Sequence, residues 1–322
     1  MTPGTLRALL GQFPMLPLVS TPSLVEPMPR LAARLGTSSP LLIKRDDAIA
    51  FGFGGNKVRK LAFVAAAARA EGADTLITAG GVQSNHARAT AAAAAKLGMH
   101  AILVANGESP SRPTANALLD ALLGAEVVYV PSRNDRSPKM IEIADRLRTE
   151  RRRPFVIPIG ASTSLGALGY VLAVAELVDQ MAPPDIIVHS TSSGGTQAGL
   201  VAGCRLLGLP TRVIGISADE SAAILAAEIE GLVRGIADLL QIPTESAAIE
   251  IDDGFVGEGY GIPTSESREA IELAARTEAI FLDPTYTAKA MAGLISYLRG
   301  GKFSGIETVL FWHTGGQVGL FA

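Results

Sequence analysis

Short runs of β-branched residues alternate with longer Ala- and Leu-rich amphipathic runs along most of the chain. The short runs predict strands at Leu41–Lys44, Thr75–Thr78, Ala101–Val104, Val127–Val130, Phe155–Pro158, Ile186–His189, Val213–Ile216 and Thr308–Trp312. The longer runs predict helices at Lys57–Ala70, Asn85–Leu97, Pro113–Leu123, Ile141–Thr149, Ser164–Gln180, Gln197–Leu207, Glu220–Leu240, Ser267–Thr277 and Ala288–Leu298. Because such alternation builds βαβ units, we expect an α/β fold with mainly parallel, twisted sheets flanked by helices. Ligand-binding residues should then lie where the carboxyl end of a strand leads into a helix.

The composition narrows the class of protein. A chain of 322 residues is long enough for two modest lobes or one large α/β domain. It has 28 Lys and Arg against 31 Asp and Glu, a formal charge of −3, so no basic excess is available for a nucleic acid. Charged residues are 18% and hydrophobic residues 48%, with a mean hydropathy of +0.30, which excludes intrinsic disorder. The single cysteine, Cys204, can form neither an intramolecular disulfide nor a thiolate metal cluster, so we expect a reduced, intracellular protein without a metal.

The longest uncharged stretch, Pro154–Ala175, matches a membrane span in residue count. It is interrupted by Pro158, Gly160 and several hydroxyl residues, so we interpret it as a strand, a polar loop and a helix. The N-terminus lacks a basic stretch followed by an apolar run, which is the pattern of a secretory signal. We therefore expect a cytoplasmic protein with no membrane partner.

The first candidate motif is the glycine-rich turn Gly52–Lys57. It is similar to a dinucleotide-binding fingerprint, but Lys57 stands where the third glycine would be. The turn instead places a lysine at the start of a helix, where the helix dipole disfavours a cation and lowers the pKa of the amine. A neutral amine of this kind can form an imine with an aldehyde. The alternative is a solvated lysine that follows an ordinary turn.

The second motif, Ala79–His86, follows a predicted strand. Its residues Gln83, Ser84 and Asn85 offer backbone and side-chain donors at a helix start, which suits a carboxylate. The alternative is a helix that Ser84 or Asn85 caps without any ligand, and we interpret His86 as a structural residue of the first turn.

The third motif, Thr191–Gly199, also joins a strand to a helix. Its glycines and hydroxyls can surround a phosphate at the helix N-terminus. It lacks the Gly-Lys-Ser/Thr ending of a nucleotide P-loop, so a phosphate monoester fits better than a triphosphate. The alternative is an ordinary turn. Further hydroxyl groups follow apolar segments at Leu282–Thr287 and Phe311–Gly316 and occur at Tyr260, and each of these is a weak signal alone.

Together, the lysine turn, the Gln-Ser-Asn loop and the Ser-Gly-Gly-Thr cup resemble the pyridoxal-phosphate-dependent lyases of the tryptophan synthase β-like fold (fold type II). The chain is similar to the branch that holds D-cysteine desulfhydrase and 1-aminocyclopropane-1-carboxylate (ACC) deaminase. The matching segments follow one another over nearly the whole chain and are Ile43–Asp47, Gly54–Leu61, Gln83–Arg88, Gly194–Leu200, Leu282–Pro284, Tyr286–Thr287, Lys289–Met291 and His313–Gly316.

The resemblance implies a role for each matching residue. Lys57, next to Asn56, would be the Schiff-base lysine, and Asn85 would contact the ring hydroxyl of the cofactor. The phosphate would lie against Ser193, Gly194, Gly195 and Thr196. Ser84, with Gln83 and neighbouring amides, would hold the substrate carboxylate, Tyr260 and Tyr286 would face the substrate, and Thr287 or Thr314 would lie near the pyridine nitrogen. The family also implies pyridoxal 5'-phosphate as cofactor, a small domain (residues 55–163) inserted in a large cofactor-binding domain (residues 1–54 plus 164–322), and a homodimer.

One position departs from the deaminases of this branch that open the cyclopropane ring. They carry glutamate where this chain has Thr287. A hydroxyl holds the pyridine nitrogen protonated less well than a carboxylate does, which favours α,β-elimination over ring opening. We therefore expect a carbon–sulfur lyase on a small amino acid, with D-cysteine giving pyruvate, ammonia and sulfide as the leading candidate. ACC deamination, sulfite release from cysteate, racemisation and a regulatory protein that only binds the cofactor stay open, as does the choice of Lys57 or Ser84 as the base.

Overall fold

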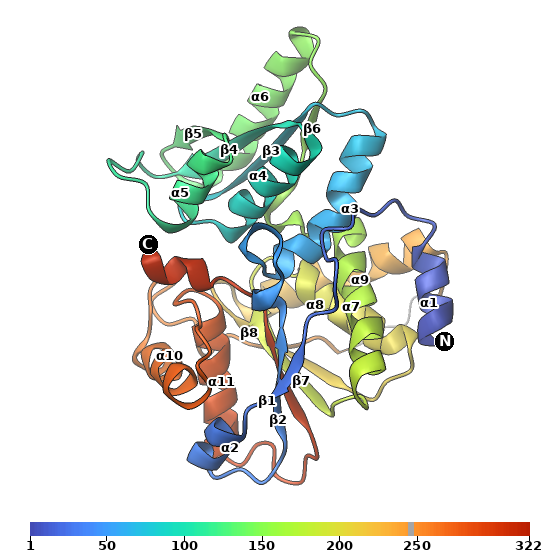
Figure 1. The fold of residues 1–322 in the computed structure, drawn as a ribbon, viewed down its shortest axis with the longest axis vertical. Coiled ribbons are helices and arrows are strands. Elements are labelled where there is room, and N and C mark those ends of the chain that lie inside the picture. The colour runs from blue at the N-terminus through green and yellow to red at the C-terminus, as the bar shows by residue number, and fades with distance from the viewer. Residues whose placement is uncertain (244–247) are drawn as a thin grey trace.

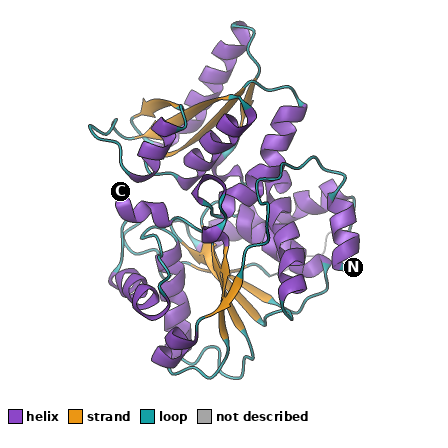
Figure 2. Ribbon diagram, viewed as in Figure 1, coloured by secondary structure: helices purple, strands orange, loops and turns teal. Residues whose placement is uncertain are grey.

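The strands form two separate sheets, one in each half of the molecule (Figures 1 and 2). The computed structural model describes residues 1–243 and 248–322. The larger sheet contains, in spatial order, β1 (Val25–Pro27), β2 (Leu41–Arg45), β10 (Val309–His313), β7 (Ile186–Thr191), β8 (Arg212–Ser217) and β9 (Glu250–Asp252). The smaller sheet contains β5 (Glu126–Val130), β4 (His100–Asn106), β3 (Thr75–Gly81) and β6 (Pro154–Val156). Neighbouring strands are parallel except for β1, which is antiparallel to β2, so the expected α/β fold with mainly parallel sheets is confirmed.

Helices cover both sheets (Figure 2). In the described part of the chain they are α1 (Pro3–Leu10), α2 (Pro29–Leu35), α3 (Asn56–Ala70), α4 (Asn85–Leu97), α5 (Ala115–Leu122), α6 (Arg136–Thr149), α7 (Ser164–Gln180), α8 (Gly195–Leu206), α9 (Ala222–Leu240), α10 (Ser265–Glu278) and α11 (Thr287–Arg299). Each strand and helix expected from the sequence overlaps one of these elements. The sequence pattern did not predict α1, α2, β1 and β9.

Helix α6 begins five residues before the predicted start at Ile141. A 3-10 turn, η3 (Arg133–Asp135), precedes it, and a reciprocal capping box between Ser132 and Asp135 fixes the entry of the chain. The first turn of the helix is charged and contains Pro138, which the start of a helix tolerates. Because these residues interrupt the apolar pattern, the sequence gives no sign that Arg136 is helical.

Helices α3, α7 and α8 pack closely behind the larger sheet. A Cβ added to Gly169 of α7 would lie 2.2 Å from the Arg59 carbonyl oxygen of α3, and one added to Gly199 of α8 would lie 2.3 Å from the Ala167 carbonyl oxygen of α7. These glycines therefore allow the helix backbones to approach more closely than any side chain would permit. This packing fixes the helix that carries Lys57.

A buried cluster of polar groups ties α3 to the larger sheet. The carboxylate of Asp46, fully buried in the 3-10 turn η1 (Asp46–Ala48), accepts hydrogen bonds from Arg59 of α3 at 2.7–3.0 Å. It also accepts from the Tyr170 hydroxyl at 2.6 Å and from the Trp312 indole at 2.8 Å. Burial opposes ionisation, but the Arg59 charge and these donors outweigh it and lower the pKa of Asp46. One charged hub thus connects β2, α3, α7 and β10.

The smaller sheet and helices α4–α6 lie within residues 55–163, the range expected for an inserted domain. The exact boundary stays a prediction, because α3 lies between the halves and contacts both α4 and α7.

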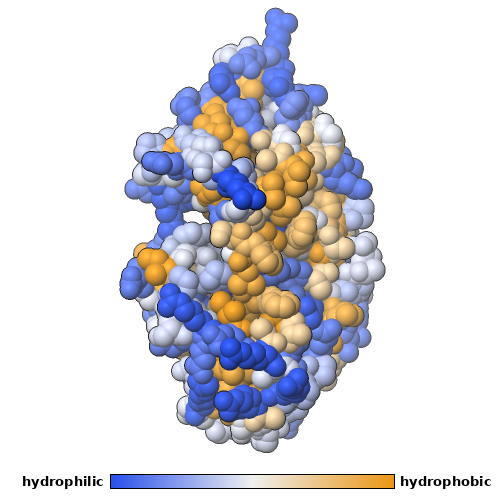
Figure 3. All heavy atoms as spheres, turned by 60° about the vertical axis from the view of Figure 1, so that its left-hand side comes forward, coloured by the Kyte–Doolittle hydropathy of each residue, from blue (hydrophilic) through white to orange (hydrophobic). Residues whose placement is uncertain are grey.

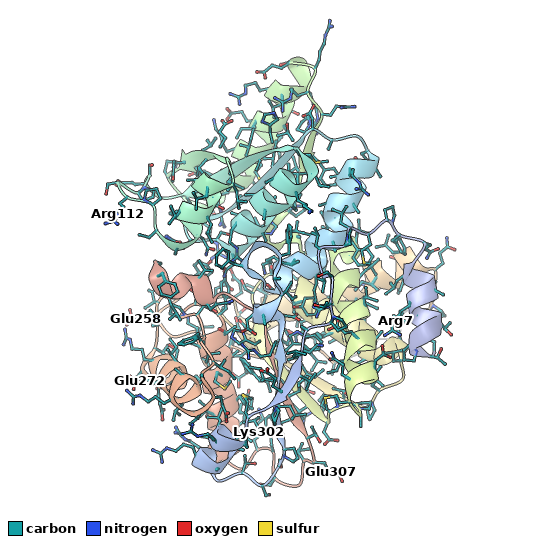
Figure 4. All side chains as sticks on the ribbon, viewed as in Figure 1. Arg7, Arg112, Glu258, Glu272, Lys302 and Glu307 are labelled. Atoms are coloured by element: carbon teal, nitrogen blue, oxygen red, sulfur yellow. The ribbon has the colours of Figure 1, made fainter. Side chains whose placement is uncertain are left out.

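Charged side chains such as Arg112, Glu258 and Glu272 point outward from the two halves (Figure 4). Residues 154–175 form β6, a 3-10 turn and part of α7, as expected, and no described helix is long and apolar enough to cross a membrane.

Candidate active site

A cavity lies where the carboxyl ends of strands from both sheets meet the starts of helices. It encloses about 990 Å³ with its open mouth included. Three of the predicted motifs reach it, since Lys57, Ser84, Asn85, Ser193 and Thr196 all line its wall. The lining comes from both halves of the molecule. Segments more than 100 residues apart in the chain therefore meet at one place, as the topology of parallel sheets predicts.

The glycines before Lys57 are needed for the path of the chain. Gly54 and Gly55 have φ angles of 68° and 94°, in the region that favours glycine. A Cβ added to Gly315 would lie 2.5 Å from the Gly55 Cα, so the two glycines pass face to face. The Asn56 amide then donates to the Thr314 carbonyl oxygen at 2.9 Å. These contacts fix the start of α3 against the end of β10.

Lys57 is the second residue of α3 and is partly buried in the cavity wall. Burial lowers the pKa of its amine to about 8, while a hydrogen bond with Lys60 and the charge of Asp283 act in the opposite direction. The direction agrees with the expectation, but the main cause is burial rather than the helix dipole. Buried Lys60, one turn later, has its pKa held well below the ordinary value by burial and by Lys57. An amine that is partly neutral near pH 7 suits imine formation.

The loop before α4 is held from two sides. The Ser84 hydroxyl caps α4 by accepting from the Ala87 amide at 3.2 Å, which leaves its own O–H free to donate. The Asn85 side-chain oxygen accepts from Asn116 of α5 at 3.0 Å. Gln83 is turned away from the cavity lining, because its side-chain oxygen accepts from the Asn116 amide at 2.9 Å. The structure thus brings Ser84 and Asn85 to the cavity and uses Gln83 to secure α5.

His86 lines the cavity, but its side chain contacts β3 and has a structural role. Its Nε2 lies 2.8 Å from the Thr78 hydroxyl on β3, and burial holds the pKa of the imidazole well below its usual range. A buried, neutral imidazole with a fixed partner agrees with the structural interpretation of this residue.

The start of α8 forms a cup of free backbone donors. Gly194 has a φ of 73° and precedes the first turn of the helix. Within the described chain, no protein acceptor takes the amides of Ser193, Gly194, Thr196 or Gln197. The Thr196 hydroxyl accepts from the Asn56 side chain at 2.9 Å, and the Ser193 hydroxyl lies 2.7 Å from that of Ser162. Unpaired amides at a helix N-terminus match the need of a phosphate for several hydrogen-bond donors.

Two tyrosines meet on the wall of the cavity. The hydroxyl groups of Tyr260 and Tyr286 are 2.5 Å apart, and their rings pack edge to face at 5.8 Å between centroids. Burial raises the pKa of both phenols, most strongly for Tyr286. Both hydroxyl groups therefore stay protonated at neutral pH, and because one donates to the other, one O–H of the pair is left to donate elsewhere.

The two candidate threonines lie in different surroundings. Thr314 lines the cavity, whereas Thr287 is fully buried and is not among the lining residues. The Thr287 hydroxyl donates to the Asp283 carboxylate at 2.7 Å and accepts from the Asp283 amide at 2.9 Å. These two bonds occupy the Thr287 hydroxyl within the loop before α11.

Sequence reasoning missed three charged residues of the cavity lining: Arg133 and Arg136 of the smaller half and Asp219, after β8. Arg133 donates to Asp219 across the cavity at 2.9 Å, and its guanidinium lies 5.5 Å from the Tyr260 ring centroid. These three residues belong to no recognisable motif, so the sequence alone did not mark them as part of a site. No group of three or more His, Cys, Asp or Glu side chains in the described ranges is arranged to hold a metal ion.

Comparison with known proteins agrees with this geometry. The family model for pyridoxal-phosphate dependent enzymes matches residues 17–315. The chain belongs to this family. Its structure is similar to one titled as an ACC deaminase homologue, with 37% identity, coverage of 98% of this chain and 96% of that one, and a TM-score of 0.92. It is also similar to processed threonine deaminase isoform 2 from Solanum lycopersicum, at 18% identity, 98% and 84% coverage and a TM-score of 0.71. A pyridoxal 5'-phosphate-dependent aspartate racemase matches at 14% identity, 98% and 95% coverage and a TM-score of 0.71.

These matches confirm the resemblance found in the sequence. The protein is a fold type II pyridoxal-phosphate enzyme of the ACC deaminase and D-cysteine desulfhydrase type. The cofactor of this family fits the cavity, since Lys57, whose amine has a lowered pKa, lines the same cavity as a cup of unpaired amides suited to a phosphate. The likeness to the threonine deaminase and the aspartate racemase concerns the fold alone.

Proposed function

We propose that this enzyme catalyses α,β-elimination on a small amino acid with a leaving group on Cβ, with D-cysteine as the leading candidate. The proposal rests on the lack of an unpaired acidic side chain among the described residues that line the cavity. Among the described lining residues only Asp219 is acidic, and it is paired with Arg133. No carboxylate is thus free to hold the pyridine nitrogen protonated, and elimination needs less stabilisation of a carbanion than ring opening does.

The residues around the cavity divide the work of binding the cofactor. Lys57 would attach its aldehyde carbon, Asn85 would meet its ring hydroxyl, and Thr314 would lie at its ring nitrogen. The cup formed by residues 193–196, with Asn56 bonded to it, would hold the phosphate. Bound in this way, pyridoxal phosphate supplies an electron-withdrawing ring that acidifies the Cα proton of an attached amino acid.

The chain itself supplies binding and proton transfer. The free O–H of Ser84 and nearby amides of the loop before α4 would donate to the substrate carboxylate. The Nζ of Lys57 or the Oγ of Ser84 would accept the Cα proton, and the lowered pKa of Lys57 keeps part of the amine neutral for this task. The O–H that the Tyr260–Tyr286 pair leaves unused would donate a hydrogen bond to the leaving group as it gains charge.

The first test combines a spectrum with a panel of substrates. Purified protein with added pyridoxal phosphate should show the visible absorption band of imine-bound cofactor, and Lys57→Ala should lose it. Lys96→Ala, an exposed lysine on α4, serves as the matched control and should keep the band. D- and L-amino acids with β-leaving groups should then yield pyruvate. A protein that binds the cofactor but releases pyruvate from no substrate would instead support a regulatory function.

We further propose a homodimer in the cytoplasm. Several large apolar side chains are strongly exposed, among them Phe53, Leu122 and Phe321. Figure 3 shows apolar side chains gathered along the middle of one face of the molecule, with polar side chains at both ends. An apolar area of this kind is typical of a surface that a protein partner covers. Analytical ultracentrifugation should give twice the chain mass of 33.4 kDa, and a monomer at micromolar concentration would contradict the proposal.

A further inference from the structure

A lysine in the first turn of α11 is buried next to the cavity without lining it. Lys289 is the third residue of the helix and has only 1% of its surface exposed. Its Nζ donates to the backbone carbonyl oxygens of Val256 at 2.7 Å, Gly259 at 2.8 Å and Ala218 at 3.2 Å. A neutral amine has only two N–H groups, so three donated bonds require the charged ammonium. Lys289 thus places a positive charge among backbone carbonyl groups.

This position is unfavourable for a cation alone. The helix dipole opposes a positive charge in the first turn of a helix. Burial lowers the pKa of the Lys289 amine, while the charges of Asp219 and Asp283 act in the opposite direction. A buried ammonium is stable here only because its hydrogen-bond acceptors are held around it. The lysine and the three carbonyl groups therefore fix one another.

The segments that Lys289 joins carry three residues of the cavity lining. One of the bonded carbonyl groups immediately precedes Asp219 in the chain, and another immediately precedes Tyr260. Tyr286 is the residue before α11 and lies on the same segment as Lys289. We call Asp219, Tyr260 and Tyr286, which all line the cavity, the tyrosine wall. One ammonium thus lies where the three segments of this wall meet.

The loop that carries Tyr260 depends most on this contact. Its glycines 257, 259 and 261 have φ angles of 66°, 144° and 77°, in the region that favours glycine. Apart from turns within the loop, the backbone of residues 255–263 is hydrogen-bonded to other described segments through Lys289 alone. A glycine-rich backbone with so few bonds can adopt other conformations easily. The distance between the hydroxyl groups of Tyr260 and Tyr286 therefore rests on Lys289.

We propose that Lys289 is a positioning residue for the reaction, and that its ammonium serves as a built-in monovalent cation around which the tyrosine wall assembles. This inference rests on the proposed function, in which the tyrosine pair donates to the leaving group. Oxygen atoms 2.7–3.2 Å from the charge are too distant for Mg²⁺ or Ca²⁺, whose oxygen ligands lie at about 2.0–2.6 Å. Backbone carbonyl groups are ligands that K⁺ accepts. Removal of the side chain should therefore leave a site that K⁺ or NH₄⁺ can occupy.

The first experiment removes the ammonium of the holoenzyme and then supplies a free cation. Lys289→Ala should keep the visible band of bound pyridoxal phosphate but lower kcat about 10- to 100-fold, the cost of a misplaced catalytic group, with a smaller change in KM. KCl or NH₄Cl should restore most of the lost kcat, whereas choline chloride at the same ionic strength should not. The wild type should respond to none of these salts.

Two further variants serve as controls. Lys289→Met fills the space of the lysine stem without a charge, so it should stay slow with or without K⁺. Lys302→Ala removes an exposed lysine that follows the same helix and should behave as the wild type does.

A second measurement needs no turnover. Hydrogen exchange followed by mass spectrometry should show faster exchange at residues 254–263 in Lys289→Ala than in the wild type, and K⁺ should slow it again. The amides of α9 should exchange equally in both proteins. Lys289→Gln keeps two N–H donors, so it should lie between them in kcat and in loop exchange. It also tests the inference if Lys289→Ala does not fold.

Together the measurements separate this inference from the proposed function. If the wild type eliminates from no substrate but loop exchange responds to Lys289→Ala and to K⁺, the role of Lys289 stands and the lyase function fails. If elimination proceeds and Lys289→Ala keeps the wild-type kcat and loop exchange, the lyase function stands and the role of Lys289 fails. A loss of kcat in Lys289→Ala that neither K⁺ nor NH₄⁺ reverses would also overturn the inference, because the positive charge would then not be what assembles the wall.

Discussion

Thr287 and Asp283 bond to each other through both their side chains and their backbones. The Asp283 carboxylate accepts from the Thr287 hydroxyl at 2.7 Å and from the Thr287 amide at 2.9 Å, while the Asp283 amide donates back to that hydroxyl. The same carboxylate accepts from the amides of Thr285 and Tyr286. One side chain thus organises the whole turn that places Tyr286 at the cavity.

Replacing each candidate threonine by valine separates their roles. Thr287→Val removes two hydrogen bonds from a buried turn, so we expect the free energy of unfolding to fall by about 1–3 kcal/mol with little change in the visible spectrum of the bound cofactor. Thr314→Val should shift that spectrum or weaken cofactor binding and cost less stability. Urea unfolding and absorption spectra check both variants. The reverse result would move the contact with the ring nitrogen back to Thr287.

The lowered pKa of Lys57 predicts how cofactor uptake depends on pH. With a pKa of about 8, roughly a tenth of the amine is neutral at pH 7, against well under a thousandth for an ordinary lysine near 10.4. The rate at which cofactor-free protein takes up pyridoxal phosphate should rise about tenfold per pH unit below 8 and level off above it. Stopped-flow absorbance measures this rate. A rise that continues to pH 10 would show that Lys57 titrates normally.

Replacing a glycine of the phosphate cup and a glycine of an exposed helix face by alanine compares the two positions. A Cβ at Gly195 would lie 2.7 Å from the Ser162 hydroxyl and 2.9 Å from the Ser162 Cα, so Gly195→Ala should displace the cup and weaken cofactor binding. Gly231 lies in the exposed face of α9 with no atom within 4 Å of its Cβ position. Gly231→Ala should stabilise the fold by about 0.5–1 kcal/mol. Fluorescence titration with pyridoxal phosphate and thermal unfolding compare the pair, and equal cofactor affinity in both variants would contradict a role of the cup.

The charged hub at Asp46 predicts how stability depends on pH. Its folded pKa is lowered, so its contribution is fully present above the unfolded value near 3.9 and is lost as pH falls through the folded value. Asp46→Asn leaves Arg59 without its main partner and should cost about 3–5 kcal/mol at pH 7. Tyr170→Phe removes one donor to Asp46 and should cost about 1.5–3 kcal/mol.

Chemical unfolding between pH 3 and pH 8 measures both variants of the hub. The deficit of Asp46→Asn should shrink toward pH 3, because only the wild type loses the carboxylate there. A deficit that is constant over this range would argue that the Asp46 charge contributes no stability.

Local pattern was enough for much of the fold and for the parts of the site that are contiguous in sequence. The strands β3 and β7 each lead into a loop with glycines and hydroxyls, and this neighbourhood alone predicted where Ser84 and Thr196 lie. The pattern did not show which partner a polar side chain finds in the fold. Gln83 accepts from the Asn116 amide on α5, and the Thr287 hydroxyl donates to Asp283 in its own turn.

Arg136 shows the same limit in another form. It lines the cavity because the fold brings the start of α6 there. The residues next to it in the sequence do not show that placement. The lowered pKa of Lys57 has a similar origin, since its direction followed from the helix start but its main cause is burial by segments from elsewhere in the chain.

The place of β10 at the centre of the larger sheet bears on the order in which the molecule assembles. β10 pairs with β2 on one side, where Val309 opposes Leu41, and with β7 on the other. Contacts between such distant segments form late, because closing a long loop costs more entropy than closing a short one. The smaller sheet is built from contiguous chain and should form first, and the Lys57 turn, bonded to Thr314, should become competent for the cofactor only when β10 has inserted. Pulsed hydrogen exchange during refolding should therefore find the amides of β3 and β4 protected before those of β2 and β10.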